Sequence, residues 1–258
     1  MRRLVFLLVF LGACGTPLQT GVFLGAIFDV PDDLVSRAVP VDEMRYLMWF
    51  PPGYEVGDDV PLVVFLHGSG DDDYDSRWLT SYGLAGVLAF EGLPSERPFV
   101  LLAPQAAPGT SWDMGRQPAT VLALIDEVLA RFDIDPAVVA LTGLSMGGYG
   151  SWHLATHFPD RFATVASVSG SGYGSTELPE DIDVCSLAEV DLRAYHGSRD
   201  LISLLELNMA VVERWETRCG SEVDFRVVDD AGHFETFEQV YRDPDFYDWF
   251  LPVPGFTD

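Results

Sequence analysis

The segment LTGLSMGGYG, residues 141–150, places one serine between two glycines in the pattern Gly143-x-Ser145-x-Gly147. A serine hydroxyl acts as a nucleophile when a neighbouring base takes its proton. Glycines at these two places allow a tight turn from a strand into a helix, which presents the hydroxyl above a sheet. An apolar run precedes the pattern and a helical run follows it. We therefore expect Ser145 to be a catalytic nucleophile.

A reactive serine needs a base, and the base needs an acid that orients it. At such a turn the acid follows the serine in the chain, and the histidine follows the acid. His233, in VVDDAGHFETF, occupies an expected strand-to-helix loop, and we assign it as the base. Asp200 follows the run LRAYHGS, and we assign it as the acid. An aspartate there also suits a helix N-cap, and the two roles can coexist.

The other titratable residues in this half of the chain receive different roles. Asp229 and Asp230 lie on or beside the strand that leads to the base, and we interpret them as solvated or turn residues. His153 and His157 are four residues apart on an expected helix, but no glutamate follows the first, so the zinc motif H-E-x-x-H is absent. His196 is interpreted as a packing residue. We expect no metal and no cofactor.

Catalysis at a serine also requires two donors for the oxyanion that forms on the substrate. The backbone N–H of Met146, directly after the nucleophile, is the first candidate. The loop after PLVVFLHGSG supplies the second, for which we assign the N–H of Ser69, with Gly70 as the alternative. Glycines in this loop let the backbone approach a substrate closely.

Short apolar runs must form the strands that position these residues. Such runs cover residues 45–50, 60–68, 98–104, 138–145, 162–170, 192–198 and 223–232. Helical patterns alternate with them over residues 119–132, 147–157, 201–218 and 234–250. This alternation predicts an α/β fold with a mostly parallel central sheet and helices on both faces. In such sheets the functional residues gather beyond the carboxyl ends of the strands.

The composition restricts the partners. The 258 residues include 40 acidic and 15 basic side chains, for a formal net charge of −25, and every one of the basic residues is an arginine. This surface repels nucleic acid and anionic lipid headgroups. A saline habitat and a GC-rich genome explain the acidic, lysine-free composition equally well.

The first residues, MRRLVFLLVFLGAC, have the layout of a secretory signal: two arginines, an apolar run from Leu4 to Leu11, and small residues before Cys14. The run is too short to span a bilayer. LGAC resembles the lipobox of bacterial lipoproteins, in which the cysteine is acylated. An ordinary cleaved signal with an incidental cysteine is the alternative.

We therefore expect a signal over residues 1–13, a tether with the first strands over 14–40, and a catalytic domain over 41–258. The mature protein is expected to be exported and held at a membrane, periplasmic or at the cell surface, by a lipid on Cys14, or alternatively secreted. Export places Cys185 and Cys219 in an oxidising compartment. They either pair there or remain buried thiols, and the sequence leaves both possibilities open.

Five segments together resemble the α/β-hydrolase superfamily: RYLMWFPPGYEVGDDVPLVVFLHGSG, LLAPQ, DPAVVALTGLSMGGYGSWHLATHFPDRFA, HGSRD and DAGH. They are most similar to the carboxylesterase and prolyl-oligopeptidase-like group, which includes feruloyl and polyhydroxybutyrate-depolymerase-type esterases. The resemblance covers about residues 45–250. It implies the α/β-hydrolase fold, with Ser145, Asp200 and His233 as the catalytic triad.

The resemblance also implies that the loop after LLAPQ approaches the site. Gln105 and Trp112 on this loop are therefore candidate substrate-binding residues, although Trp112 equally suits a place in the core. Two departures leave the substrate open. Relatives often carry a basic turn where this chain has Asp71-Asp72-Asp73, and Val-Pro where it has Ile202-Ser203.

The expected function is that of an extracytoplasmic serine ester hydrolase, a carboxylesterase with feruloyl esters among its candidate substrates, acting on a small-molecule or polymer-linked ester. A serine peptidase of the prolyl-oligopeptidase-like type would use the same triad, but such enzymes usually carry a gating domain for which this chain has no room. A catalytically dead, lipid-anchored binding module is a third interpretation. The complete triad disfavours it.

Overall fold

The computed structural model describes residues 44–70, 79–92, 94–173, 177–180 and 183–252, together with the backbone of strands β1 (Phe6–Leu8) and β2 (Val22–Phe28). Only these two strands represent the expected signal and tether. Cys14 and the acidic turn Asp71–Asp73 lie outside the described residues. Within the described part of the chain, no helix combines the length and the hydrophobicity needed to cross a membrane.

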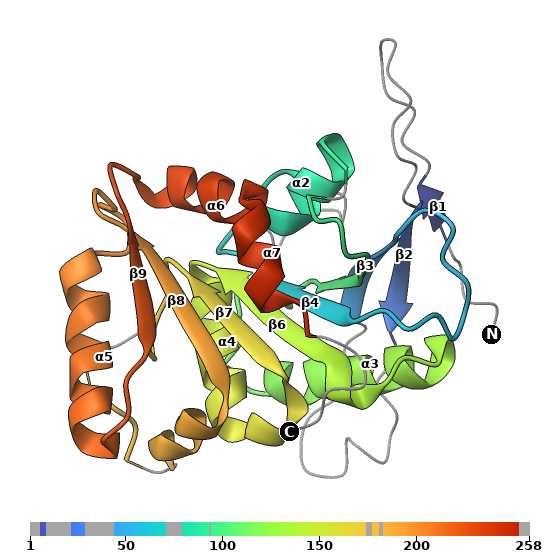
Figure 1. Cartoon of the computed structure of the whole chain (residues 1–258). Coiled ribbons are helices and arrows are strands. Elements are labelled where there is room, and N and C mark those ends of the chain that lie inside the picture. The colour runs from blue at the N-terminus through green and yellow to red at the C-terminus, as the bar shows by residue number, and fades with distance from the viewer. Residues whose placement is uncertain are drawn as a thin grey trace.

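A nine-stranded sheet forms the centre of the molecule, in the order β1-β2-β3-β5-β4-β6-β7-β8-β9 (Figure 1). Strand β3 (Met44–Phe50) runs antiparallel to β2 and β5. In the order of the sheet, the six strands from β5 to β9 are parallel to one another. They are β4 (Leu62–Leu66), β5 (Val100–Pro104), β6 (Val139–Leu144), β7 (Thr164–Val168), β8 (Asp191–Gly197) and β9 (Asp224–Val228). The mostly parallel sheet expected from the apolar runs is confirmed.

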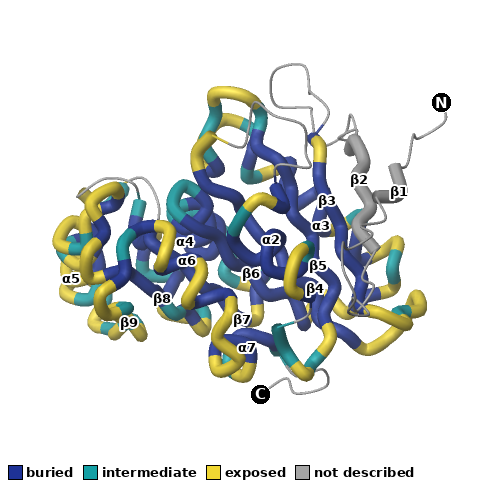
Figure 2. Tube along the Cα trace, turned by 90° about the horizontal axis from the view of Figure 1, so that it is seen from above, coloured by how far each residue is buried: buried dark blue, intermediate teal, exposed yellow. Residues whose placement is uncertain are grey.

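Helices cover both faces of the sheet, as the sequence predicts (Figure 1). One face packs against α3 (Gln117–Phe132), α4 (Met146–His157) and α5 (Leu205–Cys219). The other packs against α2 (Gly83–Phe90), α6 (His233–Arg242) and α7 (Pro244–Phe250). Trp152 and Trp215 are fully buried in the first layer, and Phe65, Tyr241 and Phe250 in the second. Figure 2 shows the central strands β4, β5, β6 and β7 buried in the middle, and exposed residues on the edge strand β9 and on the outer helices and loops.

Two helices differ from their expected bounds for local reasons. The expected helix over residues 201–218 begins only at Leu205, because the backbone of the preceding residues turns around the Asp200 carboxylate. The expected helix over 234–250 is divided between Asp243 and Pro244. Proline lacks an N–H donor and disfavours helical backbone in the residue before it. The sequence did not predict α2 or the short 3₁₀ helices η2 (Pro136–Val138), η3 (Pro159–Arg161) and η4 (Val184–Glu189).

Cys185 and Cys219 form a disulfide, which decides between the two alternatives that the sequence left open. The bond joins η4 to the last residue of α5, and the two Cα atoms are 5.3 Å apart. The indole N–H of Trp215 donates a 2.7 Å hydrogen bond to the carbonyl of Val184 and joins the same two elements. Helix α5 is thereby fixed at its carboxyl end.

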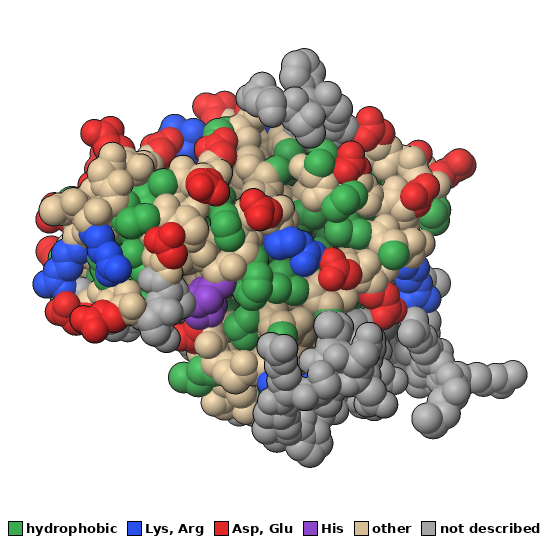
Figure 3. All heavy atoms as spheres, turned by 90° about the horizontal axis from the view of Figure 1, so that it is seen from below, with side chains coloured by type: hydrophobic (Ala, Val, Ile, Leu, Met, Phe, Trp, Pro, Cys, Tyr) green, Lys and Arg blue, Asp and Glu red, His purple; other side chains and the backbone are tan. Residues whose placement is uncertain are grey.

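Acidic side chains are scattered over the surface, and Figure 3 shows one face on which they outnumber basic ones. Arginines pair with some of them, as in Arg242 with Glu91 and Arg193 with Asp224. The 15 arginines cannot neutralise 40 carboxylates. Most acidic side chains therefore lack a cationic partner of their own.

Candidate active site

Ser145 lies at a sharp turn between β6 and α4, with φ 53° and ψ −117°. This backbone conformation is strained for any residue other than glycine, and such strain collects at functional sites. A Cβ atom on Gly143 would lie 2.2 Å from the carbonyl oxygen of Gly147, and one on Gly147 would lie 2.0 Å from that of Leu66. Both positions therefore require glycine. This is the tight strand-to-helix turn that the sequence predicts.

The turn also places the serine against its neighbouring strands. The N–H of Ser145 donates a 2.8 Å hydrogen bond to the carbonyl of Val168, the last residue of β7. Its carbonyl accepts a 3.1 Å bond from the N–H of Tyr149, in the first turn of α4. Met146 is the first residue of α4, where helical N–H groups have no acceptor within the helix. Its N–H is therefore suited to stabilise an anion.

The loop after β4 runs directly beside Ser145. A Cβ atom on Gly68 would lie 3.5 Å from the Cβ of Ser145. The Nδ1 of His67 donates a 2.7 Å hydrogen bond to the Gly68 carbonyl, and its Nε2 accepts a 3.0 Å bond from the N–H of Ala106. In a trans peptide the C=O and the next N–H point in opposite directions. His67 thus holds the N–H of Ser69 pointing away from its own ring.

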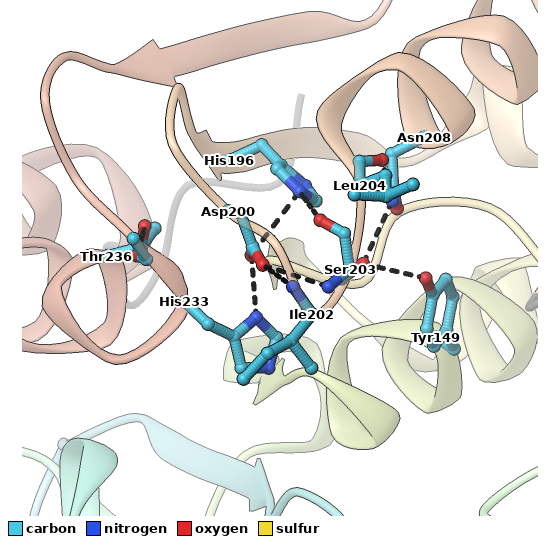
Figure 4. A network of polar contacts seen from close by, with 10 residues as sticks. Tyr149, His196, Asp200, Ile202, Ser203, Leu204, Asn208, His233 and Thr236 are labelled. Atoms are coloured by element: carbon cyan, nitrogen blue, oxygen red, sulfur yellow. Dashed lines mark hydrogen bonds and ion pairs between the residues drawn. The ribbon is translucent and has the colours of Figure 1, made fainter.

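The expected base and acid are in direct contact (Figure 4). The Nδ1 of His233, at the start of α6, donates a 2.6 Å hydrogen bond to Oδ2 of Asp200, beyond the end of β8. Oδ1 accepts 2.9 Å bonds from the N–H groups of Ile202 and Ser203. Asp200 therefore orients the histidine with one oxygen and closes a turn with the other. With Nδ1 protonated, Nε2 of a neutral His233 is left as the proton acceptor.

A second histidine lies behind the acid. The Nε2 of His196 donates a 2.6 Å hydrogen bond to the carbonyl of Ser203 and lies 3.5 Å from Oδ2 of Asp200. Burial lowers the pKa of His196, which keeps the ring neutral. Its N–H therefore points at the Ser203 carbonyl, and the neutral ring lies beside the carboxylate without adding a full charge. The sequence suggested only a packing role for this residue.

Polar side chains join the loop after Asp200 to helix α4, which follows Ser145. The hydroxyl of Tyr149, one turn after Ser145 on α4, lies 2.9 Å from the hydroxyl of Ser203. The side-chain N–H of Asn208, on α5, donates a 3.0 Å bond to the same hydroxyl. Figure 4 shows this network extending from His233 through Asp200 and Ser203 to Tyr149. The only sign of it in the sequence is the unusual Ile202-Ser203 pair.

The structure decides between the two alternatives that the sequence left open for Trp112. Trp112 is fully buried, and its indole N–H donates a 2.9 Å bond to the carbonyl of His67. Its ring packs edge-on against that imidazole, and Gly150 leaves the space for its Cβ. Trp112 is thus a core residue that supports the loop after β4, and it offers no surface for a substrate to stack on. Gln105 is also buried, with 4% of its surface exposed.

The remaining candidates lie where the sequence suggested. Asp229 and Asp230 are exposed, and Asp230 pairs with Arg199 at the surface. His153 and His157 lie on α4 with their ring centres 4.0 Å apart. In the part of the chain that the structure describes, no group of three or more histidine, cysteine, aspartate or glutamate side chains is arranged to hold a metal ion.

The strand order and the turn at Ser145 define an α/β-hydrolase fold, and comparison with known proteins identifies the family. The Esterase family model matches residues 38–180. The chain belongs to this family. A bifunctional acetylxylan esterase/xylanase of Neocallimastix patriciarum is 26% identical over 64% of the chain and 23% of its own length. Poly(3-hydroxyalkanoate) depolymerase C of Paucimonas lemoignei is 29% identical over 52% of the chain and 33% of its own length.

Solved structures share the fold. A thermostable esterase has a TM-score of 0.67 at 20% identity, over 95% of this chain and 75% of its own. A feruloyl esterase module from Clostridium thermocellum, complexed with sinapinate, has a TM-score of 0.67 at 15% identity, over 93% and 92% of the two chains. The chain spans about a quarter to a half of the length of the curated relatives it matches.

Proposed function

We propose that Ser145, His233 and Asp200 act as one catalytic triad through an acyl-enzyme. The observation that carries this proposal is the buried 2.6 Å hydrogen bond between His233 and Asp200, at the same edge of the sheet as the strained turn of Ser145. This hydrogen bond leaves Nε2 of the imidazole able to accept a proton, which a serine nucleophile requires.

The reaction follows from these roles. The Ser145 hydroxyl oxygen attacks the ester carbonyl carbon while its proton passes to Nε2 of His233. The N–H groups of Met146 and Ser69 stabilise the oxyanion. The bond to the alcohol oxygen then breaks, and the imidazolium gives that oxygen its proton. A water molecule attacks the acyl-enzyme, loses its proton to His233, and releases the acid as the proton returns to Ser145.

Substitution of the nucleophile tests the proposal. Ser145→Ala and His233→Ala should each lower kcat by about 10⁴-fold or more, and the double variant should lose little beyond either, because the residues act as a unit. A fluorophosphonate should label the wild-type protein at Ser145 only. Wild-type turnover in Ser145→Ala would exclude the triad, and an unlabelled, inactive wild type would favour the binding module. Comparing ester and anilide substrates of one acid separates an esterase from a peptidase.

The substrate range is part of the same proposal. Esters of uncharged acids are favoured over esters of anionic acids, because the strongly anionic protein repels anions. Feruloyl esters remain candidates, since the feruloyl esterase module shares the fold. A panel of p-nitrophenyl esters of increasing acyl length, with methyl ferulate beside them, measures the acyl preference. Activity confined to esters of anionic acids would contradict this expected preference.

We also propose that the protein works outside the cytoplasm, anchored by a lipid on Cys14. The Cys185–Cys219 disulfide supports export independently of the signal pattern, because such bonds persist in oxidising compartments. Mass spectrometry of the membrane fraction tests the anchor. An acylated N-terminal Cys14 is expected, and an unmodified N-terminus in soluble protein alone would reject it.

A further inference from the structure

Exposed apolar side chains gather beside the base and the acid. Ten large hydrophobic side chains are exposed among the described residues, and six of them lie within residues 201–209 or at position 234. Leu201 and Ile202 directly follow the acid and expose 85% and 66% of their surface, and Phe234 directly follows the base and exposes 56%. We call these three residues the apolar rim. Grouped exposure of this kind marks a binding surface, whereas scattered single residues do not.

The two loops that carry the rim are fixed against each other. The N–H of Arg199 donates a 2.9 Å hydrogen bond to the carbonyl of Ala231, so the acid loop and the base loop lie side by side. The ring centre of Phe234 is 5.6 Å from that of His233. The N–H of Ile202 bonds to Asp200, which in turn bonds to His233 (Figure 4). These contacts therefore hold the loops that carry the rim next to the acid and the base.

The direction of the reaction tells which half of the ester meets the rim. Under the proposed triad, on which this inference rests, the imidazole of His233 gives its proton to the leaving alcohol oxygen. That oxygen must come within hydrogen-bond reach of the ring. The alcohol half of the ester therefore passes beside His233, where the rim lies, while the acyl half stays on the serine.

We infer that the apolar rim binds the alcohol half of the substrate, and that this half is an uncharged, aliphatic group of several carbons. Glu206 and Glu235 are exposed close to the rim in the chain, and they repel an anionic alcohol such as a phosphorylated one. The rim offers hydrocarbon surface for an aliphatic chain to cover. A hydroxyl-rich sugar gains little from such a surface, because its polar groups lose hydrogen bonds to water there.

Two series of simple esters test the inference. In the first, the acid is always acetate and the alcohol lengthens from ethyl to butyl, hexyl and octyl. In the second, the alcohol is always ethanol and the acid lengthens in the same steps. All members of the first series form one acetyl-enzyme, so a rim effect changes kcat/KM without changing a deacylation-limited kcat. Each methylene that becomes fully buried should raise kcat/KM by up to about fourfold.

Leu201→Ser and Phe234→Ser each remove one apolar side chain of the rim, and both residues are exposed enough to replace without disturbing the core. Each should lower the ratio of kcat/KM for octyl acetate to that for ethyl acetate by about tenfold. The matched controls are Val56→Ser and Phe90→Ser, which are 65% and 64% exposed on other elements and should keep the wild-type ratio.

Three outcomes overturn the inference. The first is a flat alkyl acetate series in the wild type. The second is a rim variant that changes the ethyl alkanoate series instead. The third is a rim variant that changes the oligomeric state in size-exclusion chromatography but leaves the alkyl acetate ratio unaltered, because the rim would then join two copies of the chain. Failure of the triad itself is separate, since Ser145→Ala would then hydrolyse every ester at the wild-type rate.

Discussion

The substitution Asp200→Asn is a sharp test of the site, because the two oxygens of this carboxylate have different partners. Oδ1 accepts the N–H groups of Ile202 and Ser203, and Oδ2 accepts the Nδ1–H of His233. Asparagine can keep its oxygen toward the two backbone donors only by turning its NH₂ group toward His233. Two donors would then face each other, so the imidazole must carry its proton on Nε2 instead.

A histidine protonated on Nε2 cannot accept the proton of Ser145. The expected loss in kcat is about 10⁴-fold, which corresponds to about 5 kcal/mol of transition-state stabilisation. In the opposite amide orientation, the NH₂ group would face the two backbone N–H donors inside a buried turn. Those donors would then lack an acceptor, and this orientation would destabilise the folded state more than the loss of the negative charge alone. The folded state should therefore persist with the wrong tautomer at the site.

Steady-state kinetics on p-nitrophenyl acetate, together with urea unfolding of the same samples, separate catalysis from stability. The matched control is Asp230→Asn, an exposed acid paired with Arg199, which should change stability by less than about 1 kcal/mol and leave kcat unaltered. A kcat within tenfold of wild type in Asp200→Asn would refute this reasoning. An inactive Asp229→Asn beside a fully active Asp200→Asn would show that the acid lies elsewhere.

Three further predictions concern stability. The double variant Cys185→Ser/Cys219→Ser opens a loop with a sequence separation of 34 residues. Its free energy of unfolding should fall by about 4 kcal/mol and its Tm by about 10 °C. A Tm equal to that of the oxidised wild type would contradict this prediction. Burial, with His157 nearby, lowers the pKa of His153 to about 4. Because this pKa lies below the unfolded value of about 6.5, the wild type should lose stability relative to His153→Gln as the pH falls from 6.5 to 4. If the difference in urea unfolding between the two proteins does not change with pH, the prediction is wrong. Unpaired carboxylates repel one another, so Tm should rise from low salt to 1 M NaCl, where the Debye length is ~3 Å, and a flat Tm would favour genome composition as the origin of the charge.

The sequence predicted the parts of the site that depend on local patterns. Apolar runs located the strand ends, and the two glycines around Ser145 predicted a turn in which side chains do not fit. The structure confirms that no side chain fits at either glycine. A Cβ on Gly147, for example, would lie 2.0 Å from a backbone oxygen. The contact between Asp200 and His233 was likewise expected from their order in the chain and their places after strands, and the structure shows that these strands, β8 and β9, are neighbours.

Contacts between distant segments were not predictable in the same way. The hydrogen bond between Tyr149 and Ser203 joins residues 54 positions apart, and no spacing rule relates them. The sequence left Trp112 open between the core and a substrate contact, because its burial depends on the space left by Gly150, on another element. The sequence placed the start of helix α5 at residue 201 instead of Leu205. It does not show that the Asp200 carboxylate accepts hydrogen bonds from the N–H groups of Ile202 and Ser203.

The disulfide also determines what a protease can do to this protein. The bond between Cys185 and Cys219 closes a covalent ring of the chain. This ring includes strand β8, Asp200 and the exposed loop that follows it. Ser145 lies on the chain before the ring and His233 on the chain after it. A cut within the ring therefore yields one molecule of unchanged mass apart from an added water, and its two pieces separate only after reduction. The exposed segment beside the acid can be nicked without releasing a fragment that carries either the nucleophile or the base.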